Sequence, residues 1–119
     1  MASRLDGAGV AKLATLDDAL TQLQRVHALV ERMASAARSN QDVGPMRQQI
    51  HRAASPLVGL LKPQFGMIAD QISQMILILT RGGGDQMKVR AMREGVAQVR
   101  TQIEVSMAKV REQHTVTDA

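Results

Sequence analysis

The sequence contains no cysteine, tryptophan or tyrosine, and Phe65 is its single phenylalanine. Without cysteine the chain can form no disulfide, no thiolate nucleophile and no cysteine-ligated zinc site. Strands usually draw on aromatic and β-branched side chains. The apolar residues, 45% of the chain, are instead mainly Ala, Val, Leu and Ile, together with eight Met. That composition, beside many Gln, Arg and Glu, favours helices.

Long apolar runs are also missing. The longest is MILIL, Met75–Leu79, which is far shorter than the roughly 20 residues of a membrane-spanning helix. The first residues, MASRLDGAGVAKL, lack the apolar stretch of a signal peptide. We therefore expect a protein without a membrane span, located in the cytoplasm.

The charge is slightly basic and evenly spread. The chain has 15 Lys and Arg against 11 Asp and Glu, a formal net charge of +4. Acidic residues intervene in every basic segment, which is typical of a solvated helix surface. A second alternative function is weak nucleic-acid binding by the last helix, through Lys88, Arg90, Arg93 and Arg100. We expect no such binding, because single-strand binding relies on aromatic stacking.

Apolar residues recur at alternating steps of three and four in two long segments, which predicts helices with a heptad seam. The first helix is expected from Val10 to Arg38. Its predicted seam is Leu13, Leu16, Leu20, Leu23, His27, Val30, Ala34 and Ala37, widened on one side by Val26 and Met33. The last helix follows RGGGD, the glycine-rich stretch that begins at Arg81. Its predicted seam is Val89, Met92, Val96, Val99, Ile103, Ser106, Val110 and Gln113.

The middle segment runs from Met46 to about Thr80, and its heptad phase slips between Pro56 and Pro63. Proline inside a helix removes a backbone hydrogen bond and kinks or ends the helix. The sequence therefore predicts an all-α antiparallel bundle of three long helices, the second kinked or split near Pro56–Pro63. We expect one domain, residues 1–119, with flexible ends at residues 1–9 and 115–119.

Three helices leave much apolar surface exposed, so we expect the bundle to be completed by a second copy, as a homodimer. The later part of the middle segment has the widest apolar face. We predict that a protein partner or a second copy binds there, through Ile68, Ile72, Met75, Ile76 and Leu79.

Residues for catalysis or metal binding do not group in the sequence. The three histidines, His27, His51 and His114, lie on three different segments, and none follows a glutamate by three residues, the spacing used in di-iron bundles. No Gly-x-Ser-x-Gly nucleophile motif is present. We therefore expect no enzymatic activity, cofactor, metal site or small-molecule substrate.

The stretch HRAASPL resembles the phosphoacceptor box of histidine-kinase dimerisation and histidine-phosphotransfer domains. The pattern of that family is His-Glu-hydrophobic-Arg-Thr/Ser/Asn-Pro-Leu. This chain matches it at His51, Ser55, Pro56 and Leu57, and has Ala53 at the hydrophobic place. The resemblance implies that His51 is exposed on a helix, accepts a phosphoryl group from a partner and passes it to an aspartate on another.

The wider layout is similar over about 65 residues, because RGGGD begins thirty residues after His51 and leads into an antiparallel helix. Three positions depart from the pattern. Arg52 replaces the acidic residue that helps the imidazole act as a base, Ala54 replaces the arginine, and Pro63 is an addition. The chain contains no ATP-binding domain, so it is not expected to phosphorylate itself.

Two functions thus follow from the sequence. The first is a non-enzymatic, self-associating interaction or scaffold module that acts through apolar helix faces. The alternative is a histidine-phosphotransfer or degenerate histidine-kinase dimerisation domain with His51 as the phosphoacceptor. The phosphotransfer alternative requires His51 to face water, whereas the scaffold function predicts an oligomer that depends on protein concentration.

Overall fold

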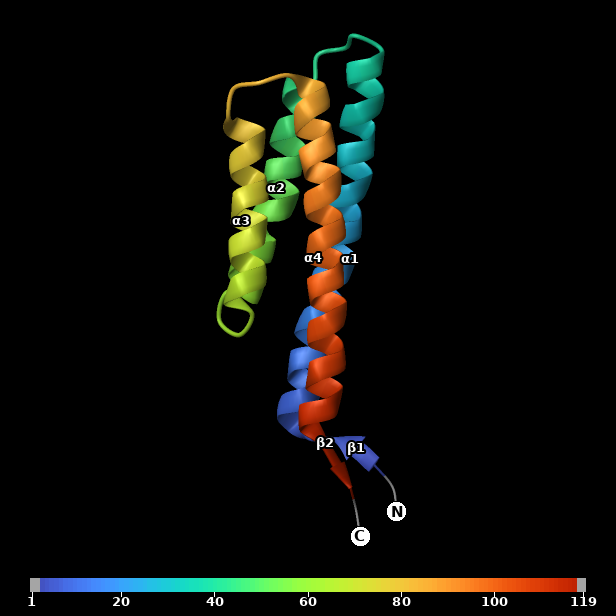
Figure 1. Ribbon diagram of the computed structural model, residues 1–119, viewed down its shortest axis with the longest axis vertical. Coiled ribbons are helices and arrows are strands. Elements are labelled where there is room, and N and C mark those ends of the chain that lie inside the picture. Colours follow the sequence, from blue (N-terminus) through green and yellow to red (C-terminus); the bar gives the residue numbers. More distant parts are fainter. Residues whose placement is uncertain (1–2, 118–119) are drawn as a thin grey trace.

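The computed structural model describes residues 3–117, which form four helices and a two-stranded ribbon (Figure 1). The elements in chain order are β1 (Ser3–Leu5), α1 (Gly7–Arg38), α2 (Gly44–Leu61), α3 (Gly66–Thr80), α4 (Asp85–His114) and β2 (Thr115–Thr117). Each helix packs against the next one along the chain, and α4 closes the bundle against α1. The molecule is elongated, measuring 63 × 22 × 17 Å.

The middle segment is split into two helices rather than kinked. Residues 3–117 therefore contain four helices, where the sequence pattern predicted three. Helix α2 ends at Leu61, and a short turn that contains Pro63 leads into α3. Pro56 stays inside α2. Pro45 lies in the first turn of α2, where its missing N–H leaves no helix bond unmade. The all-helical bundle is confirmed, and the split gives it a fourth helix from its own chain.

Helices α2 and α3 are shorter than the other two, and they divide the molecule into two parts (Figure 1). All four helices pack together in one part. In the other part α1 and α4 continue alone as a pair, and this pair ends in the β1–β2 ribbon. Strands β1 and β2 are antiparallel, with Arg4 opposite Val116. We call this part the ribbon end.

The ribbon also bears on the predicted flexible ends. The structure pairs Ser3–Leu5 with Thr115–Thr117 and begins α1 at Gly7, so most of the two predicted flexible segments lies in regular structure. Residues 1–2 and 118–119 lie outside the described residues.

The buried seam of α4 follows its predicted positions closely. The buried side chains on this helix are Val89, Met92, Val96, Val99, Ile103 and Val110. Ser106, also predicted for the seam, is half-buried, and Gln113 is exposed. Helix α4 contacts α1 and α3.

The seam of α1 is shifted from its prediction. The predicted seam residues that are buried are Leu16, Leu23, Val30 and Ala34, and the core of α1 also contains Ala19, Val26, Met33 and Ala36. His27 is only half-buried, and Leu20 lies at the edge of the core. Helix α1 contacts both α2 and α4, so its interior face turns toward the groove between these two helices.

Among residues 3–117, no helix has both the length and the apolar character needed to cross a membrane.

Candidate functional site

His51 lies in the second turn of α2 with its side chain exposed to solvent. Its direction follows from its neighbour in sequence, because Ile50 is fully buried and successive helix residues point about 100° apart. The rest of the buried face of α2 is formed by Ala54, Leu57 and Leu61. The core thus fixes α2 in a rotation that turns His51 outward.

Ser55, one helical turn after His51, holds its imidazole ring. The Ser55 hydroxyl lies 2.7 Å from the His51 carbonyl oxygen and 3.3 Å from His51 Nδ1. The hydroxyl has one proton, which it donates to the carbonyl, so toward Nδ1 its oxygen acts as an acceptor. This network assigns the ring proton to Nδ1 and leaves the lone pair on Nε2, to which no hydrogen bond is made by residues 3–117.

An open pocket of about 420 Å³ lies beside the His51 ring. We call it the His51 pocket. It is lined by Gly44, Arg47, Gln48, His51 and Arg52 of α2, Leu79 and Thr80 of α3, and Lys88 of α4. The fold assembles this lining from three helices, because α2 begins where α3 ends and α4 starts.

The pocket lining holds three cationic side chains and no carboxylate. Arg47 Nη1 lies 3.1 Å from Asp85 Oδ1, an ion pair that joins α2 to the start of α4. The Lys88 ammonium donates to the Leu79 carbonyl at the end of α3, over 3.3 Å. Arg52 makes no hydrogen bond or ion pair within residues 3–117. One of the three cations is thus free to bind an anion without first losing a partner.

The pocket beside His51 is therefore basic, and the Nε2 atom of His51 lies at its edge without a hydrogen-bond partner among residues 3–117. No protein-family model, curated protein or solved structure matches this chain. The short resemblance of HRAASPL to a phosphoacceptor box consequently depends on these residues and their geometry alone.

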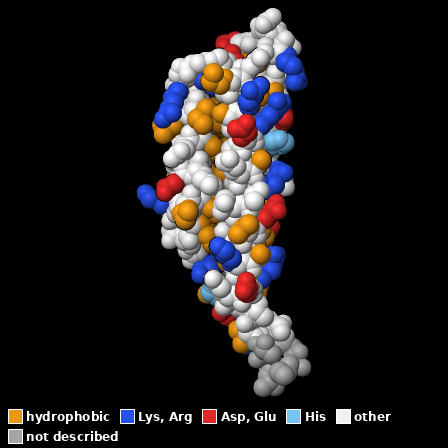
Figure 2. Space-filling model, viewed as in Figure 1, with side chains coloured by type: hydrophobic (Ala, Val, Ile, Leu, Met, Phe, Trp, Pro, Cys, Tyr) orange, Lys and Arg blue, Asp and Glu red, His pale blue; other side chains and the backbone are white. Residues whose placement is uncertain are grey.

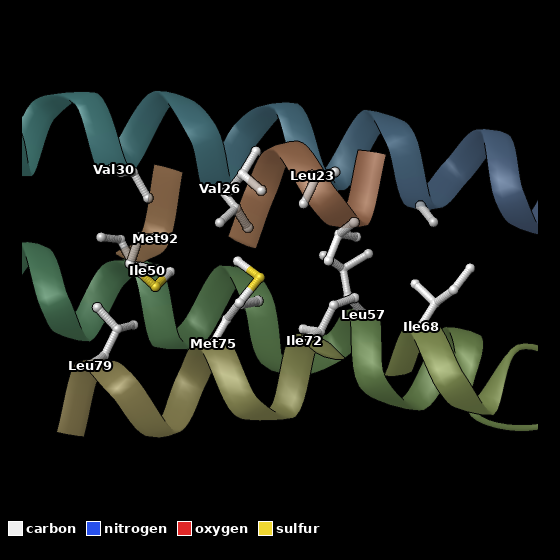
Figure 3. Close-up of a cluster of buried hydrophobic side chains, with 14 of the residues drawn as sticks. Leu23, Val26, Val30, Ile50, Leu57, Ile68, Ile72, Met75, Leu79 and Met92 are labelled. Carbon is white, nitrogen blue, oxygen red and sulfur yellow. The ribbon is translucent and has the colours of Figure 1, made fainter. Parts of the chain in front are cut away.

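The predicted partner face is found in the protein's own core. Ile68, Ile72, Met75 and Leu79 are at most 4% exposed, and they point between the helices toward α1 and α4 (Figure 3). The fifth member, Ile76, is half-buried and packs against that core. The wide apolar face predicted from the sequence is explained by α2, which α3 contacts as a separate neighbour.

The basic residues of α4 are divided, with Lys88 lining the His51 pocket and Arg90 and Arg93 lying together elsewhere, near Arg38 of α1. Arg93 is held by Glu31 of α1 in a two-pronged ion pair, with Nη2 2.7 Å from Oε2 and Nε 3.0 Å from the same oxygen. This hydrogen bond holds the pKa of Glu31 below its usual value. Basic and acidic side chains are interleaved on the face shown in Figure 2. The arrangement gives no support to nucleic-acid binding by this helix.

His27 is near the same ion pair, with Nε2 4.0 Å from Glu31 Oε1. It is half-exposed and does not belong to the core seam in which the sequence pattern placed it. Within residues 3–117, no three His, Cys, Asp or Glu side chains come together as a metal site.

The third histidine, His114, takes part in a contact that the sequence does not suggest. Its Nδ1 lies 3.1 Å from Asp6 Oδ1, and its Nε2 lies 3.2 Å from Lys12 Nζ. Asp6 also caps α1, because its carboxylate accepts a hydrogen bond from the Gly9 N–H at 2.7 Å. That bond is the largest cause of the lowered pKa of Asp6, and His114 lowers it further. We call His114, Asp6 and Lys12 together the His114 clamp.

Proposed function

We propose that the protein is a histidine-phosphotransfer module in which His51 accepts a phosphoryl group. The observation that carries this proposal is the exposed His51 ring, whose Nε2 lone pair is directed away from the Ser55 contact and stands beside a pocket with three cations. The resemblance of HRAASPL to a phosphoacceptor box supports the same residue.

The chemistry requires only positioning and charge. Nε2 attacks the phosphorus atom of a donor, an N–P bond forms, and the leaving group departs with the electron pair of the bond that breaks. Phosphoryl transfer depends mainly on alignment and on cations that balance the charge of the equatorial oxygens. Arg52 and Lys88 are placed to supply that charge, and Arg guanidinium groups suit phosphate geometry.

Arg52 stands where the resembled family has an acidic residue, and this departure gives the site a different means of preparing the ring. In the family an acid assists the imidazole as a base. Here the Ser55 oxygen can accept a hydrogen bond from Nδ1–H, which favours the tautomer that has its lone pair on Nε2 without that acid. Arg52 in turn brings a positive charge toward the incoming phosphoryl group.

The direct test is phosphorylation of the purified protein by phosphoramidate, a small donor that needs no partner protein. We expect one phosphoryl group per chain, visible by intact-protein mass spectrometry and released at acidic pH, as phosphohistidine is. His51→Gln should lose it. His27→Gln changes a half-exposed histidine on α1 and serves as the control. Labelling that survives in His51→Gln, or that is lost equally in His27→Gln, would contradict the proposal.

Self-association is the second candidate, and exposed apolar side chains on α3 favour it. Helix α3 is the most apolar of the four helices in residues 3–117, and part of its apolar surface remains uncovered. Met67 is 84% exposed and Leu77 is 51% exposed. A second copy would cover these side chains and would serve the interaction role predicted from the sequence. Light scattering over a range of concentrations tests this. We expect a dimer that Leu77→Gln weakens, whereas Met87→Gln, which changes an exposed apolar side chain on α4, leaves it intact.

A further inference from the structure

We infer that the His51 pocket is a reversible binding site for small phosphate compounds, such as a phosphate monoester or a diphosphate. This goes beyond phosphorylation of His51, because binding here uses Arg52, Arg47 and Lys88 and needs no covalent step. The two activities therefore can be separated experimentally.

Charge and size together define the ligand. Arg52 and Lys88 approach from different helices, and the lining between them includes Gln48 and Thr80, whose polar groups can bind phosphate oxygens. Three cations around one pocket favour an anion with more than one negative charge. The volume of about 420 Å³ exceeds the needs of a bare phosphate ion and lies within the range of small-molecule sites.

Leu79 also lines the pocket, at the end of α3. Its side chain is 3% exposed and belongs to the core, so it offers a ligand almost no apolar surface. Its carbonyl accepts a hydrogen bond from Lys88. A ligand in this pocket would therefore be held mainly by charged and polar groups.

The ion pair of Arg47 with Asp85 sets the affinity of this pocket. Arg47 and His51 are four residues apart and so share one face of α2. Arg47 can bind a phosphate only if its guanidinium gives up part of its contact with the Asp85 carboxylate, 3.1 Å away. Asp85 is therefore an internal competitor of the ligand. Its removal should strengthen binding.

Calorimetry or amide-resonance shifts with inorganic pyrophosphate test the inference, at low ionic strength because charge contacts are screened by salt. We expect saturable binding by the full chain. Arg52→Gln and Lys88→Gln should each weaken it about tenfold, as expected for loss of one charged hydrogen bond. Asp85→Asn should strengthen it several-fold. Circular dichroism shows whether each variant keeps its helices.

Matched controls separate the pocket from net charge. Arg100→Gln makes the same charge change as Arg52→Gln, and Glu104→Gln the same as Asp85→Asn, at exposed positions of α4 outside the pocket lining. Both should leave the affinity unchanged. Equal effects of Arg52→Gln and Arg100→Gln, or resonance shifts reproduced by chloride at matched ionic strength, would overturn the inference.

His51→Gln distinguishes this inference from the proposed function. It removes the nucleophile but none of the three cations, so pyrophosphate should bind within a few-fold of the unmodified affinity. A protein that binds pyrophosphate but is never phosphorylated supports the pocket and rejects the phosphotransfer role. Phosphorylation at His51 without saturable pyrophosphate binding supports the phosphotransfer role and rejects the pocket.

Discussion

The two ends of the bundle each contain a histidine, and they use it differently. His114, at the ribbon end, is held on both ring nitrogens, by Asp6 and Lys12, and its side chain is only 17% exposed. His51, at the opposite end, is exposed and held on one nitrogen by Ser55. The first ring has both nitrogens engaged in contacts between chain segments. The second retains a lone pair that can react.

The difference follows from how each end is stabilised. Around His51 all four helices contribute to an apolar core, so the polar groups on the surface above it need no structural role. At the ribbon end only α1 and α4 are present, and two helices bury little apolar surface. There the His114 clamp and the β1–β2 ribbon hold the segments together. Arg52, at the pocket end, is thus free to bind a ligand.

The largest expected effect is that of truncating the core beneath the pocket. Ile50 is fully buried next to His51, so Ile50→Ala should lower the free energy of unfolding by about 2–5 kcal/mol. Val10→Ala at the ribbon end removes a side chain that is 56% exposed, and should change stability by less than about 0.5 kcal/mol. Urea denaturation measures both. Similar losses for the two variants would show that the ends do not differ in this way.

The second prediction exchanges the two histidines for alanine. His114→Ala leaves Asp6 and Lys12 without their partly buried partner, and should cost about 1–2 kcal/mol of stability. His51→Ala removes only an exposed ring from a helix and should change stability by less than about 0.5 kcal/mol. Phosphorylation by phosphoramidate should show the reverse, with loss in His51→Ala alone. A large stability loss in His51→Ala would indicate a structural histidine.

The third prediction uses two glycines. A Cβ added at Gly9 would lie 2.6 Å from the Cβ of His114, so Gly9→Ala must push α1 and α4 apart. We expect a net loss of about 1–2 kcal/mol. Gly59 lies inside α2 with nothing near its missing Cβ, and Gly59→Ala should gain about 0.5–1 kcal/mol from helix propensity. A gain in both variants, measured by thermal or urea denaturation, would mean that the ribbon end tolerates separation of its helices.

The core was predictable where a helix has one clear apolar stripe. The three-four pattern found Val89, Met92 and Val96 on α4 correctly. On α1 two overlapping patterns share Leu16 and Leu23, and only the position of α2 and α4 decides between them. The small side chain of Ala19 in the core carried too weak a signal, and the larger Leu20 was preferred. His27, a polar residue within the predicted seam, was the one sign in the sequence that this seam was displaced from the core.

The site was only partly predictable. His51 and Ser55 are one turn apart, so a local motif could identify them. Arg47 and Asp85 are 38 residues apart, and His114 and Asp6 are 108 apart. Such pairs depend on how the helices close into a bundle, which no local pattern describes. The predicted partner residues illustrate the same limit, because the sequence shows that a face is apolar and does not show which neighbour covers it.

The smallest expected effect is a change of stability with pH at the ribbon end. The Gly9 hydrogen bond and the His114 contact hold the pKa of Asp6 below its ordinary value of 3.8 in the folded protein. Since the folded pKa is lower than the unfolded one, the Asp6 contribution is present above about pH 4 and is lost as pH falls through the folded pKa. Asp6→Asn keeps a residue that can cap a helix but removes the charge.

Urea denaturation between pH 6 and 2.5 should therefore show a shallower fall in stability for Asp6→Asn than for the unmodified chain. Glu31→Gln provides the comparison away from the clamp, because the Arg93 hydrogen bond also lowers the pKa of Glu31, from 4.5. Its contribution is lost over a pH range that begins higher, since its unfolded pKa is higher. An Asp6→Asn profile that runs parallel to that of the unmodified chain would show that the carboxylate charge adds nothing to the clamp. The ribbon end would then be held by His114 packing and the strand pairs, and its contrast with the solvent-facing His51 would be one of burial rather than of charge.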